Sequence, residues 1–309
     1  MTITQLEYIV AVDTYRSFVM AADKCSVTQP TLSMQVQKLE ETLGVKIFDR
    51  SKQPVVPTEI GIEIIAQARV LLAESEKIHE IITDREKEPS GELKIGIIST
   101  VASYILPKLI SGFVQKYPSV RLIVQEMAAT EIIQQLKLGT LDCGIMSTPL
   151  YEPLLTEIPV FYENFVVYSS KHSKLFKKKN IDADDIDTED IYLLNEAHCM
   201  REQALNICKH RRTSKNSLNF EYPAGSMEML KRMVDQIGGA TILPELALAD
   251  LGDKQLEKVR HFKSPEPARE ISIVIQKNFA KRRMIEALKT EILEIVPKRM
   301  KSRKKKEVI

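Results

Sequence analysis

Residues 18–44, FVMAADKCSVTQPTLSMQVQKLEETLG, contain two short helical patterns that are separated by a tight turn. The small pair Ala21-Ala22 in the first pattern allows another helix to approach closely. Thr28 suits the start of the second helix, and Pro30 follows in the first turn, where proline is tolerated. Two such helices predict a helix-turn-helix. Apolar residues recur in the second helix at spacings of four, three and four, and we expect them to form its buried stripe: Leu32, Val36, Leu39 and Leu43.

The opposite face of this second helix carries no acidic residue before Glu40. Its polar side chains have the donors and acceptors that contact base edges and phosphates in the major groove of DNA. Residues 45–58 then hold two short extended runs around a turn with cations at its tip, which is typical of a hairpin wing. Segment 1–58 is not basic as a whole, so a small helical interaction module is the alternative. The candidate DNA-contacting residues are Gln29, Pro30, Thr31, Ser33, Met34, Gln35, Lys38, Arg50 and Lys52.

A longer helical pattern begins at Glu59. Small and apolar residues recur at alternating spacings of three and four, which is a heptad seam. An exposed seam of this length needs a partner, and a second copy of the same helix is the simplest one. Pro89 and Gly91 then end the pattern, so we expect a dimerising linker helix over residues 59–88. The seam residues are Gly61, Ile64, Ala68, Leu71, Ser75, Ile78 and Ile82.

Beyond Gly91 the chain alternates apolar strand patterns with helical ones. This order predicts a mostly parallel sheet with helices on both faces, hence an α/β fold. A second set of elements follows, which includes a strand at residues 218–222, LNFEY, and the last strand and helix return to the first set. A cleft between two such lobes is a usual place for a small ligand. We expect the lobes to comprise residues 91–163 with 268–297, and residues 164–267.

Two of the four cysteines lie in residues 195–208, NEAHCMREQALNIC, of which residues 202–208 have a good helical pattern. Cys199 opens that helix beside His198 and Arg201, and cysteines in such places usually have a lowered pKa. On one continuous helix Cys199 and Cys208 are about 13 Å apart along the axis and on opposite faces. Because a disulfide needs Cα atoms within about 7 Å, the pair can bond only if the backbone rearranges. This geometry suits a redox switch in which Cys199 is the sensing thiol and Cys208 the resolving thiol.

Two other interpretations of these cysteines stay open. In the first, both side chains are ordinary core residues. In the second, they form a zinc site with His198 and His210, although the chain has no C-x-x-C pair and the spacing fits no common zinc finger. We expect Cys25 and Cys143 to be core residues, and we expect no metal and no cofactor.

The composition is ordinary for a globular protein, with 44% apolar and 28% charged residues. The chain shows no signal-peptide pattern and no apolar run of transmembrane length, so we expect a cytoplasmic protein that does not bind membranes. A disulfide in that compartment is transient rather than structural. Residues 298–309 carry seven Lys or Arg and one Glu, and we expect this basic tail to be solvated and disordered.

The order of helix-turn-helix, wing, heptad helix and two-lobed α/β domain resembles that of the LysR-type transcriptional regulators. The resemblance covers nearly the whole chain. It implies a winged helix-turn-helix domain at residues 1–58 and a two-lobed regulatory domain like the type 2 periplasmic binding proteins. The residues that carry it are Phe18, Ala21-Ala22, Val27, Gln29-Pro30, Leu32-Ser33, Leu39-Glu40, Leu43-Gly44, Phe48, Arg50, Thr58, Gly139, Leu141-Asp142 and Ile242-Leu243-Pro244.

Within this family the chain resembles the members that sense hydrogen peroxide. That resemblance implies that Cys199 attacks peroxide, with Thr100 and His198 orienting the reactants and Arg269 supporting the thiolate. The sulfenic acid then condenses with Cys208 in an intramolecular disulfide. The motifs that carry it are H-C-x-R-x-Q-A at residues 198–204, Cys208, Ser99-Thr100, L-D-C at residues 141–143 and P-E-P-x-R at residues 265–269.

The family also implies partners and an output. Promoter DNA and RNA polymerase are the expected macromolecular partners, the chain forms dimers through its linker helix and then tetramers, and oxidation activates antioxidant genes. Two positions depart from the family. The usual cleft threonine falls on Ala129, with Thr130 one place later, where we expect it to cap the next helix; otherwise the pocket hydrogen bond is made differently. Met34 replaces a frequent arginine.

The sequence is compatible with two functions other than peroxide sensing. The alternative within the family is a regulator that binds a small organic effector in the cleft between the lobes, with both cysteines passive. A thiol peroxidase ranks last, because the chain has no thioredoxin-like, nucleotide-binding or metal-binding motif. We therefore expect a regulator and not an enzyme.

Overall fold

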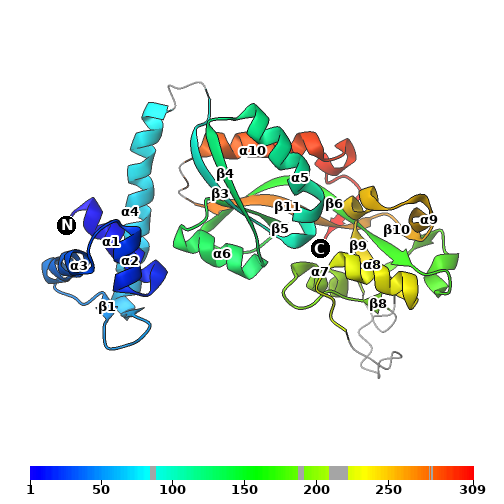
Figure 1. The fold of residues 1–309 in the computed structure, drawn as a ribbon. Coiled ribbons are helices and arrows are strands. Elements are labelled where there is room, and N and C mark those ends of the chain that lie inside the picture. Colours follow the sequence, from blue (N-terminus) through cyan, green and yellow to red (C-terminus); the bar gives the residue numbers. More distant parts are fainter. Residues whose placement is uncertain (84–87, 187–190, 209–221, 278, 280) are drawn as a thin grey trace. The chain divides into compact units, whose positions relative to one another are not determined.

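The computed structural model describes the 309-residue chain except for residues 84–87, 187–190, 209–221, 278 and 280 (Figure 1). Contacts within the chain define two compact units. The first comprises Met1–Lys87 with Asn278–Arg282, and the second comprises Glu88–Lys277 with Arg283–Ile309. Each unit has its own apolar core. None of the described helices is both long enough and apolar enough to cross a membrane.

The first unit begins with the three helices that the sequence predicts, and each has a polar cap at its start. Thr2 caps α1 (Ile3–Tyr15), Ser17 caps α2 (Phe18–Lys24) and Thr28 caps α3 (Gln29–Leu43). Each cap oxygen accepts a backbone N–H that the helix itself leaves without a partner. The wing follows as a two-stranded antiparallel hairpin of β1 (Phe48–Asp49) and β2 (Val56–Pro57).

The buried stripe of α3 differs from the prediction at one position. Leu32, Val36 and Leu39 are fully buried, but Leu43 keeps 40% of its surface exposed. Helix α3 ends there, and Gly44 turns the chain away in the left-handed conformation. The inward position near this end is taken by the carboxylate of Glu40, which is 1% exposed.

Helix α4 (Glu59–Thr83) is the predicted linker helix. The first part of its heptad seam is used within the unit, because Gly61 and Ala68 are buried against the three-helix core. Leu71 and Ile78, farther along the seam, are 42% and 63% exposed. We expected the whole seam to pair with a second copy of the helix. Only its later part, with Leu71 and Ile78, offers exposed apolar side chains for such pairing.

Gly61 lies where the start of α4 touches the wing segment. A Cβ atom at this position would lie 2.1 Å from the carbonyl oxygen of Ile47. Thr58 fixes the same junction, because its hydroxyl donates to the carbonyl of Lys46 at 2.6 Å and accepts the Gly61 N–H at 3.0 Å. A glycine is needed here because the two backbones pass too close for any side chain.

In the second unit, a parallel sheet of β3 (Gly91–Ile97), β4 (Val120–Glu126) and β5 (Cys143–Thr148) has β3 in the middle. The helices of this lobe are α5 (Ser99–Lys116), α6 (Ala129–Leu138) and α10 (Arg282–Ile295). Figure 1 shows α5 and α10 on one face of the sheet and α6 on the other. Helices α5 and α10 are joined by a 2.6 Å ion pair between Lys116 and Glu291. This is the predicted βαβα arrangement.

Two long strands connect this lobe with the next one. Strand β6 (Leu155–Ser169) pairs antiparallel with β11 (Glu266–Gln276), and β11 also pairs antiparallel with β5. The later residues of β6 then pair with β9 (Ala240–Pro244) and β10 (Val259–Phe262) of the second lobe. The lobe boundary expected between residues 163 and 164 thus falls inside one continuous strand, and the sheet is mixed rather than mostly parallel.

The remaining elements surround these strands. The predicted strand at residues 218–222 overlaps the undescribed segment 209–221, so that prediction lies outside the described residues. The remaining elements of the second lobe are β7 (Asn180–Ile181), β8 (Ile191–Tyr192), α7 (Cys199–Ile207), α8 (Met227–Gln236), α9 (Asp253–Leu256) and the 3-10 turns Lys174–Lys177, Ala183–Asp185 and Glu245–Asp250.

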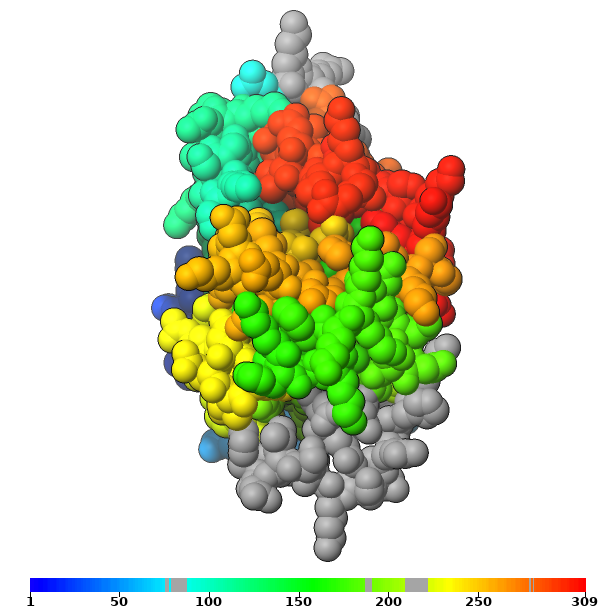
Figure 2. All heavy atoms as spheres, turned by 90° about the vertical axis from the view of Figure 1, so that its right-hand side faces the viewer, coloured from blue at the N-terminus to red at the C-terminus, as the bar shows by residue number. Residues whose placement is uncertain are grey.

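The basic tail is not disordered, so that expectation was wrong. After the turn η5 (Lys298–Lys301), strand β12 (Lys306–Val308) pairs parallel with the start of β11. Met300 is 1% exposed, and the Ile309 N–H donates to the carbonyl of Ala268 at 3.0 Å. Apolar anchors and an available strand edge thus order the segment despite its charge. In Figure 2 the red C-terminal residues are part of the continuous surface of this unit.

Replacing Gly61 with alanine forces the start of α4 away from the Ile47 carbonyl. We expect the free energy of unfolding of the first unit to fall by about 1–3 kcal/mol, the usual cost of overpacking. Chemical unfolding of the full chain, monitored through hydrogen exchange of the amides in α1 and α3, measures this change. Gln67→Ala, at an exposed site on the same helix, is the matched control. Equal stability of the two variants would refute the close-packing argument.

Candidate functional site

The predicted DNA-contacting face of α3 is open to solvent. Two of its predicted contact residues, Ser33 and Gln35, are half-buried. The side chain of Gln35 accepts a hydrogen bond from the side chain of Gln5 at 3.2 Å. Met34, where the family often has a cation, is 60% exposed at the centre of the face. Such an apolar side chain suits contact with a thymine methyl group. The exposed positions are Gln29, Pro30, Thr31, Met34 and Lys38.

Arg50 and Lys52, both predicted to contact DNA, have different surroundings. Lys52 is exposed and lies 3.9 Å from Asp49. The Arg50 guanidinium stacks 4.8 Å from the Phe18 ring centroid, donates to Ser33 at 3.2 Å and pairs with Glu40 at 3.3 Å. Arg50 therefore fastens the wing to α3, although 37% of its side chain is exposed.

Glu40 is the centre of this junction, and the sequence analysis did not single it out. One carboxylate oxygen accepts the backbone N–H groups of Ile47 and Phe48, at 2.8 and 3.2 Å. The other oxygen lies 3.3 Å from Arg50 and 3.4 Å from Lys46. The sequence does contain a sign of this role. Glu40 falls on the inward side of an amphipathic helix, and a buried acid there needs hydrogen-bond or ionic partners.

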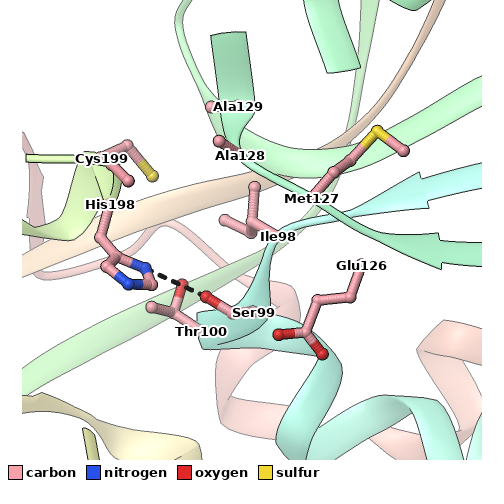
Figure 3. A pocket seen from close by; sticks show the side chains of 10 residues that line it. Ile98, Ser99, Thr100, Glu126, Met127, Ala128, Ala129, His198 and Cys199 are labelled. Atoms are coloured by element: carbon pink, nitrogen blue, oxygen red, sulfur yellow. Dashed lines mark hydrogen bonds between the residues drawn. The ribbon is translucent and has the colours of Figure 1, made fainter. Parts of the chain in front are cut away.

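The second unit has a cavity of about 200 Å³ where its two lobes meet, shown in Figure 3. It lies between the end of β3, the end of β4 and the start of α7. A second cavity of about 280 Å³ shares several of its residues and extends toward Lys231 and Asp250. The residues that line the first cavity are Ile98, Ser99, Thr100, Glu126, Met127, Ala128, Ala129, Ala197, His198 and Cys199.

Cys199 and His198 reach this cavity from the start of α7. His198 precedes the helix, and its Nδ1 lies 3.0 Å from the Ser99 hydroxyl, so a hydrogen bond joins the two lobes (Figure 3). The sulfur of Cys199 points into the same space. The structure thus brings together Ser99, Thr100, His198 and Cys199, which the sequence analysis had placed in one site.

Burial raises the pKa of the Cys199 thiol above its ordinary value. The positive charge of Arg269 and the backbone N–H groups at the start of α7 oppose this change, but burial has the larger effect. The lowered pKa expected from the sequence is therefore wrong for this conformation. The helix N-terminus does favour the thiolate, as expected, but it faces a partly enclosed cavity instead of open water.

Arg201 and Thr130 do not have the contacts expected of them, beside the Cys199 thiol and at the cap of α6. The Arg201 guanidinium donates to the carbonyl of Leu194 at 2.9 Å, so it holds the loop before α7. Thr130 is exposed in the first turn of α6 and does not cap it, because the N-cap residue is Ala128. The cavity wall at this point consists of Ala128 and Ala129, which have no side-chain donor.

Arg269 is fully buried, and its partners complete the site. It donates to the Thr100 hydroxyl at 2.8 Å and to the Thr100 carbonyl at 3.0 Å. It also forms a 2.7 Å ion pair with Glu163, which is itself fully buried. The sequence analysis missed Glu163, although an acid inside the apolar run VFYENFVVYSS was a usable signal.

Cys208 lies directly after α7 and is 2% exposed in the core of the second lobe. All four cysteines lie among the described residues, and none of them is part of a disulfide. Helix α7 runs without a break from Cys199 to Ile207, and Cys208 follows as its extended C-cap residue. At about 1.5 Å of rise per residue, the two ends of this segment lie on the order of 13 Å apart along the helix axis. Among the described residues, no group of His, Cys, Asp and Glu side chains is arranged to hold a metal ion, and His210 lies outside them.

Both units match models of one protein family. Residues 3–62 match the bacterial regulatory helix-turn-helix protein of the lysR family, and residues 86–296 match the LysR substrate binding domain. The chain belongs to the LysR family. This LysR-family chain is 34% identical to the hydrogen peroxide-inducible genes activator of Haemophilus influenzae over 274 residues, which cover 89% of this chain and 90% of the relative.

Other proteins that this LysR-family chain resembles are named OxyR. It is 33% identical over 276 residues, 89% of each chain, to the DNA-binding transcriptional dual regulator OxyR of Escherichia coli K12. Full-length OxyR C199D from Pseudomonas aeruginosa has a TM-score of 0.77 and 33% identity, covering 95% of this chain and 98% of that one. A hydrogen peroxide-bound OxyR mutant from Corynebacterium glutamicum has a TM-score of 0.60 and 25% identity, covering 95% of this chain and 94% of that one.

The raised pKa of Cys199 predicts how the reactivity of this thiol depends on pH. Below the pKa, each pH unit changes the thiolate fraction about tenfold, and the thiolate is the reactive form. We expect alkylation of Cys199 by iodoacetamide to accelerate about tenfold per unit between about pH 7 and about pH 8.5. Peptide mapping by mass spectrometry follows Cys199 alone. A rate that is already constant across this range would show that the thiol is ionised.

Arg50→Ala and Lys52→Ala separate a contact within the protein from a phosphate contact. Losing Arg50 leaves the buried Glu40 with fewer partners, so we expect faster hydrogen exchange in α3 and the wing and about tenfold weaker DNA binding. Losing Lys52 leaves exchange unchanged and lowers the slope of log affinity against log salt by about 1. If Arg50→Ala changed only the salt slope, Arg50 would be a phosphate contact.

Proposed function

We propose that this chain is a peroxide-sensing transcriptional regulator in which oxidation of Cys199 changes binding to promoter DNA. One observation carries the proposal: Cys199 faces a cavity whose lining includes the polar side chains of Ser99 and His198, while Cys208 is buried directly after the end of an intact helix. The relatives support the same conclusion, since several are named hydrogen peroxide-inducible genes activators.

The chemistry begins at the Cys199 sulfur. Its thiolate attacks one oxygen of hydrogen peroxide, the O–O bond breaks, and a sulfenic acid forms as hydroxide leaves and takes up a proton. Hydroxyl groups of Ser99 and Thr100 and the ring of His198 face the cavity and are suited to hold the two peroxide oxygens. The Cys208 thiolate then attacks the oxidised sulfur and forms the disulfide, while hydroxide leaves that sulfur and takes up a proton to give water. In sum, two thiols and one peroxide give one disulfide and two waters.

Disulfide formation is incompatible with the helix that separates the sulfurs. A disulfide requires Cα atoms within about 7 Å, so α7 must unwind or break. Gln203, in the middle of α7, donates to the Ser147 hydroxyl at 2.9 Å and to the carbonyl of Ile309 at 3.3 Å. Met200 and Ala204 are buried in the core of the second lobe. Oxidation therefore breaks contacts that reach into both lobes, and we propose that this repacking is the signal.

The output is proposed to be a change in DNA binding by an oligomer. The face of α3 around Met34 presents side chains to the major groove, and the wing lies next to it. The exposed seam residues Leu71 and Ile78 of α4 suit pairing with a second copy. We propose a dimer through α4, a tetramer through the second units, and RNA polymerase as the partner that responds at antioxidant genes in the cytoplasm.

A second candidate function rests on the larger cavity. Its walls include Lys231, which is 5% exposed and pairs with Glu228 at 2.6 Å, and the hydroxyls of Ser103 and Ser226. A small organic effector with an acidic group suits such a lining. In that case Cys199 and Cys208 are passive, and ligand binding between the lobes replaces oxidation as the signal.

Thiol trapping after a stoichiometric pulse of hydrogen peroxide separates these two functions. We expect non-reducing peptide mapping to find a Cys199–Cys208 disulfide in the wild-type chain and none in Cys199→Ser. Cys25→Ser is the matched control and keeps the bridge. In Cys208→Ser we expect a sulfenic acid at Cys199 that reacts with dimedone.

Two results would contradict peroxide sensing. One is the absence of both the disulfide and the dimedone adduct while Cys199 is accessible to iodoacetamide. The other is promoter binding that is the same before and after disulfide formation. A thermal shift caused by small carboxylates, together with inert cysteines, would favour the effector-binding regulator.

A further inference from the structure

The buried carboxylate of Glu163 has no part in the chemistry proposed above. Glu163 lies on β6 directly opposite Arg269 of β11, so the register of the two strands fixes the pair. One oxygen of Glu163 accepts from Arg269, at 2.8 Å from Nε and 2.7 Å from the terminal nitrogen. The other oxygen accepts the backbone N–H of Leu246 at 2.8 Å. Both carboxylate oxygens are therefore occupied.

The partners of Arg269 divide between two sides of its guanidinium group. Glu163 occupies the side that carries Nε, whereas Thr100 receives bonds from the two terminal nitrogens. Thr100 and Cys199 line the same cavity, and the charge of Arg269 favours the Cys199 thiolate. An isolated guanidinium at low dielectric would act strongly on a nearby sulfur. A guanidinium bonded to a carboxylate acts as part of a neutral pair, whose field is weaker.

We propose that Glu163 limits the reactivity of Cys199 by offsetting most of the charge of Arg269, the cation that favours the thiolate. Glu163 is a positioning residue and does not touch the sulfur or the oxidant. This inference deepens the proposed function and rests on it for its biological meaning. Its consequence is a thiol that stays mainly protonated at rest, so that the sensor responds at a higher peroxide concentration than an unneutralised arginine would give.

The burial of the pair supports this assignment. Arg269 and Glu163 are both 0% exposed, so solvent does not screen either charge. Burial raises the pKa of Glu163, and Arg269 together with the Leu246 N–H opposes that rise. Glu245 is a second acid close to Glu163, but it pairs with the exposed Arg299 at 2.7 Å. Glu245 therefore offers a matched position that carries the same charge without the contact to Arg269.

The test measures the ionisation of Cys199 without using peroxide. Iodoacetamide alkylation of Cys199 in the full reduced chain, followed by peptide mapping across a pH series, gives the apparent pKa of this thiol. Glu163→Gln removes the charge and keeps the side-chain length, whereas Glu163→Asp keeps the charge and shortens the side chain. Glu245→Gln removes the neighbouring charge.

We expect Glu163→Gln to lower the apparent pKa of Cys199 by about one unit, which gives about tenfold faster alkylation at neutral pH. Glu163→Asp and Glu245→Gln stay within about twofold of the wild-type rate. Unchanged alkylation in Glu163→Gln would overturn the proposal. Equal acceleration in Glu163→Asp and Glu163→Gln would also overturn it, because the role would then be geometric rather than electrostatic.

A double variant covers the case in which Glu163→Gln does not fold, since that substitution leaves a buried cation unpaired. Glu163→Gln with Arg269→Gln removes both charges, and we expect alkylation within about threefold of wild type because the two fields cancel. Alkylation more than about tenfold slower would show that Arg269 acts on Cys199 without neutralisation, which contradicts the proposal. If peroxide fails to oxidise wild-type Cys199, the proposed function fails while these alkylation rates keep their meaning.

Discussion

The second unit depends on a buried ion pair between Arg269 and Glu163. Taking two charges out of water is costly, and the cost is offset only when both groups are fully hydrogen-bonded. Here the cross-strand register fixes the pair, Thr100 accepts one hydrogen bond from each terminal nitrogen of Arg269, and Leu246 supplies a backbone N–H to Glu163. Because these partners come from β3–α5, β6, β11 and the turn after β9, the pair joins both lobes at the edge of the cavity.

Local sequence patterns predicted the elements well, because helix starts and strand alternation are decided by neighbouring residues. The start of α7 at Cys199 and the cap Thr28 are examples. Features set by distant contacts were not predictable in this way. The pKa of Cys199 depends on which elements enclose the thiol. The C-terminal segment pairs with the edge of β11, and no local pattern reveals that this edge is available.

The two units use buried carboxylates in the same way. Glu40 collects two backbone N–H groups and the cation Arg50, while Glu163 collects one backbone N–H and the cation Arg269. Each joins segments that are far apart in the sequence, and each holds an arginine that was predicted from the sequence to act elsewhere, Arg50 on DNA and Arg269 on the Cys199 thiolate. A candidate binding arginine therefore has to be considered together with the acids that the fold brings next to it.

The continuous strands β6 and β11 limit how the two lobes move. Antiparallel pairing runs from Leu155 to Asn164 against β11, and β6 continues without interruption into the sheet of the second lobe. A clamshell motion would bend this ribbon across its hydrogen bonds, whereas loss of one surface helix leaves it intact. In the proposed function, the paired strands therefore serve as a stationary frame while the segment around α7 rearranges.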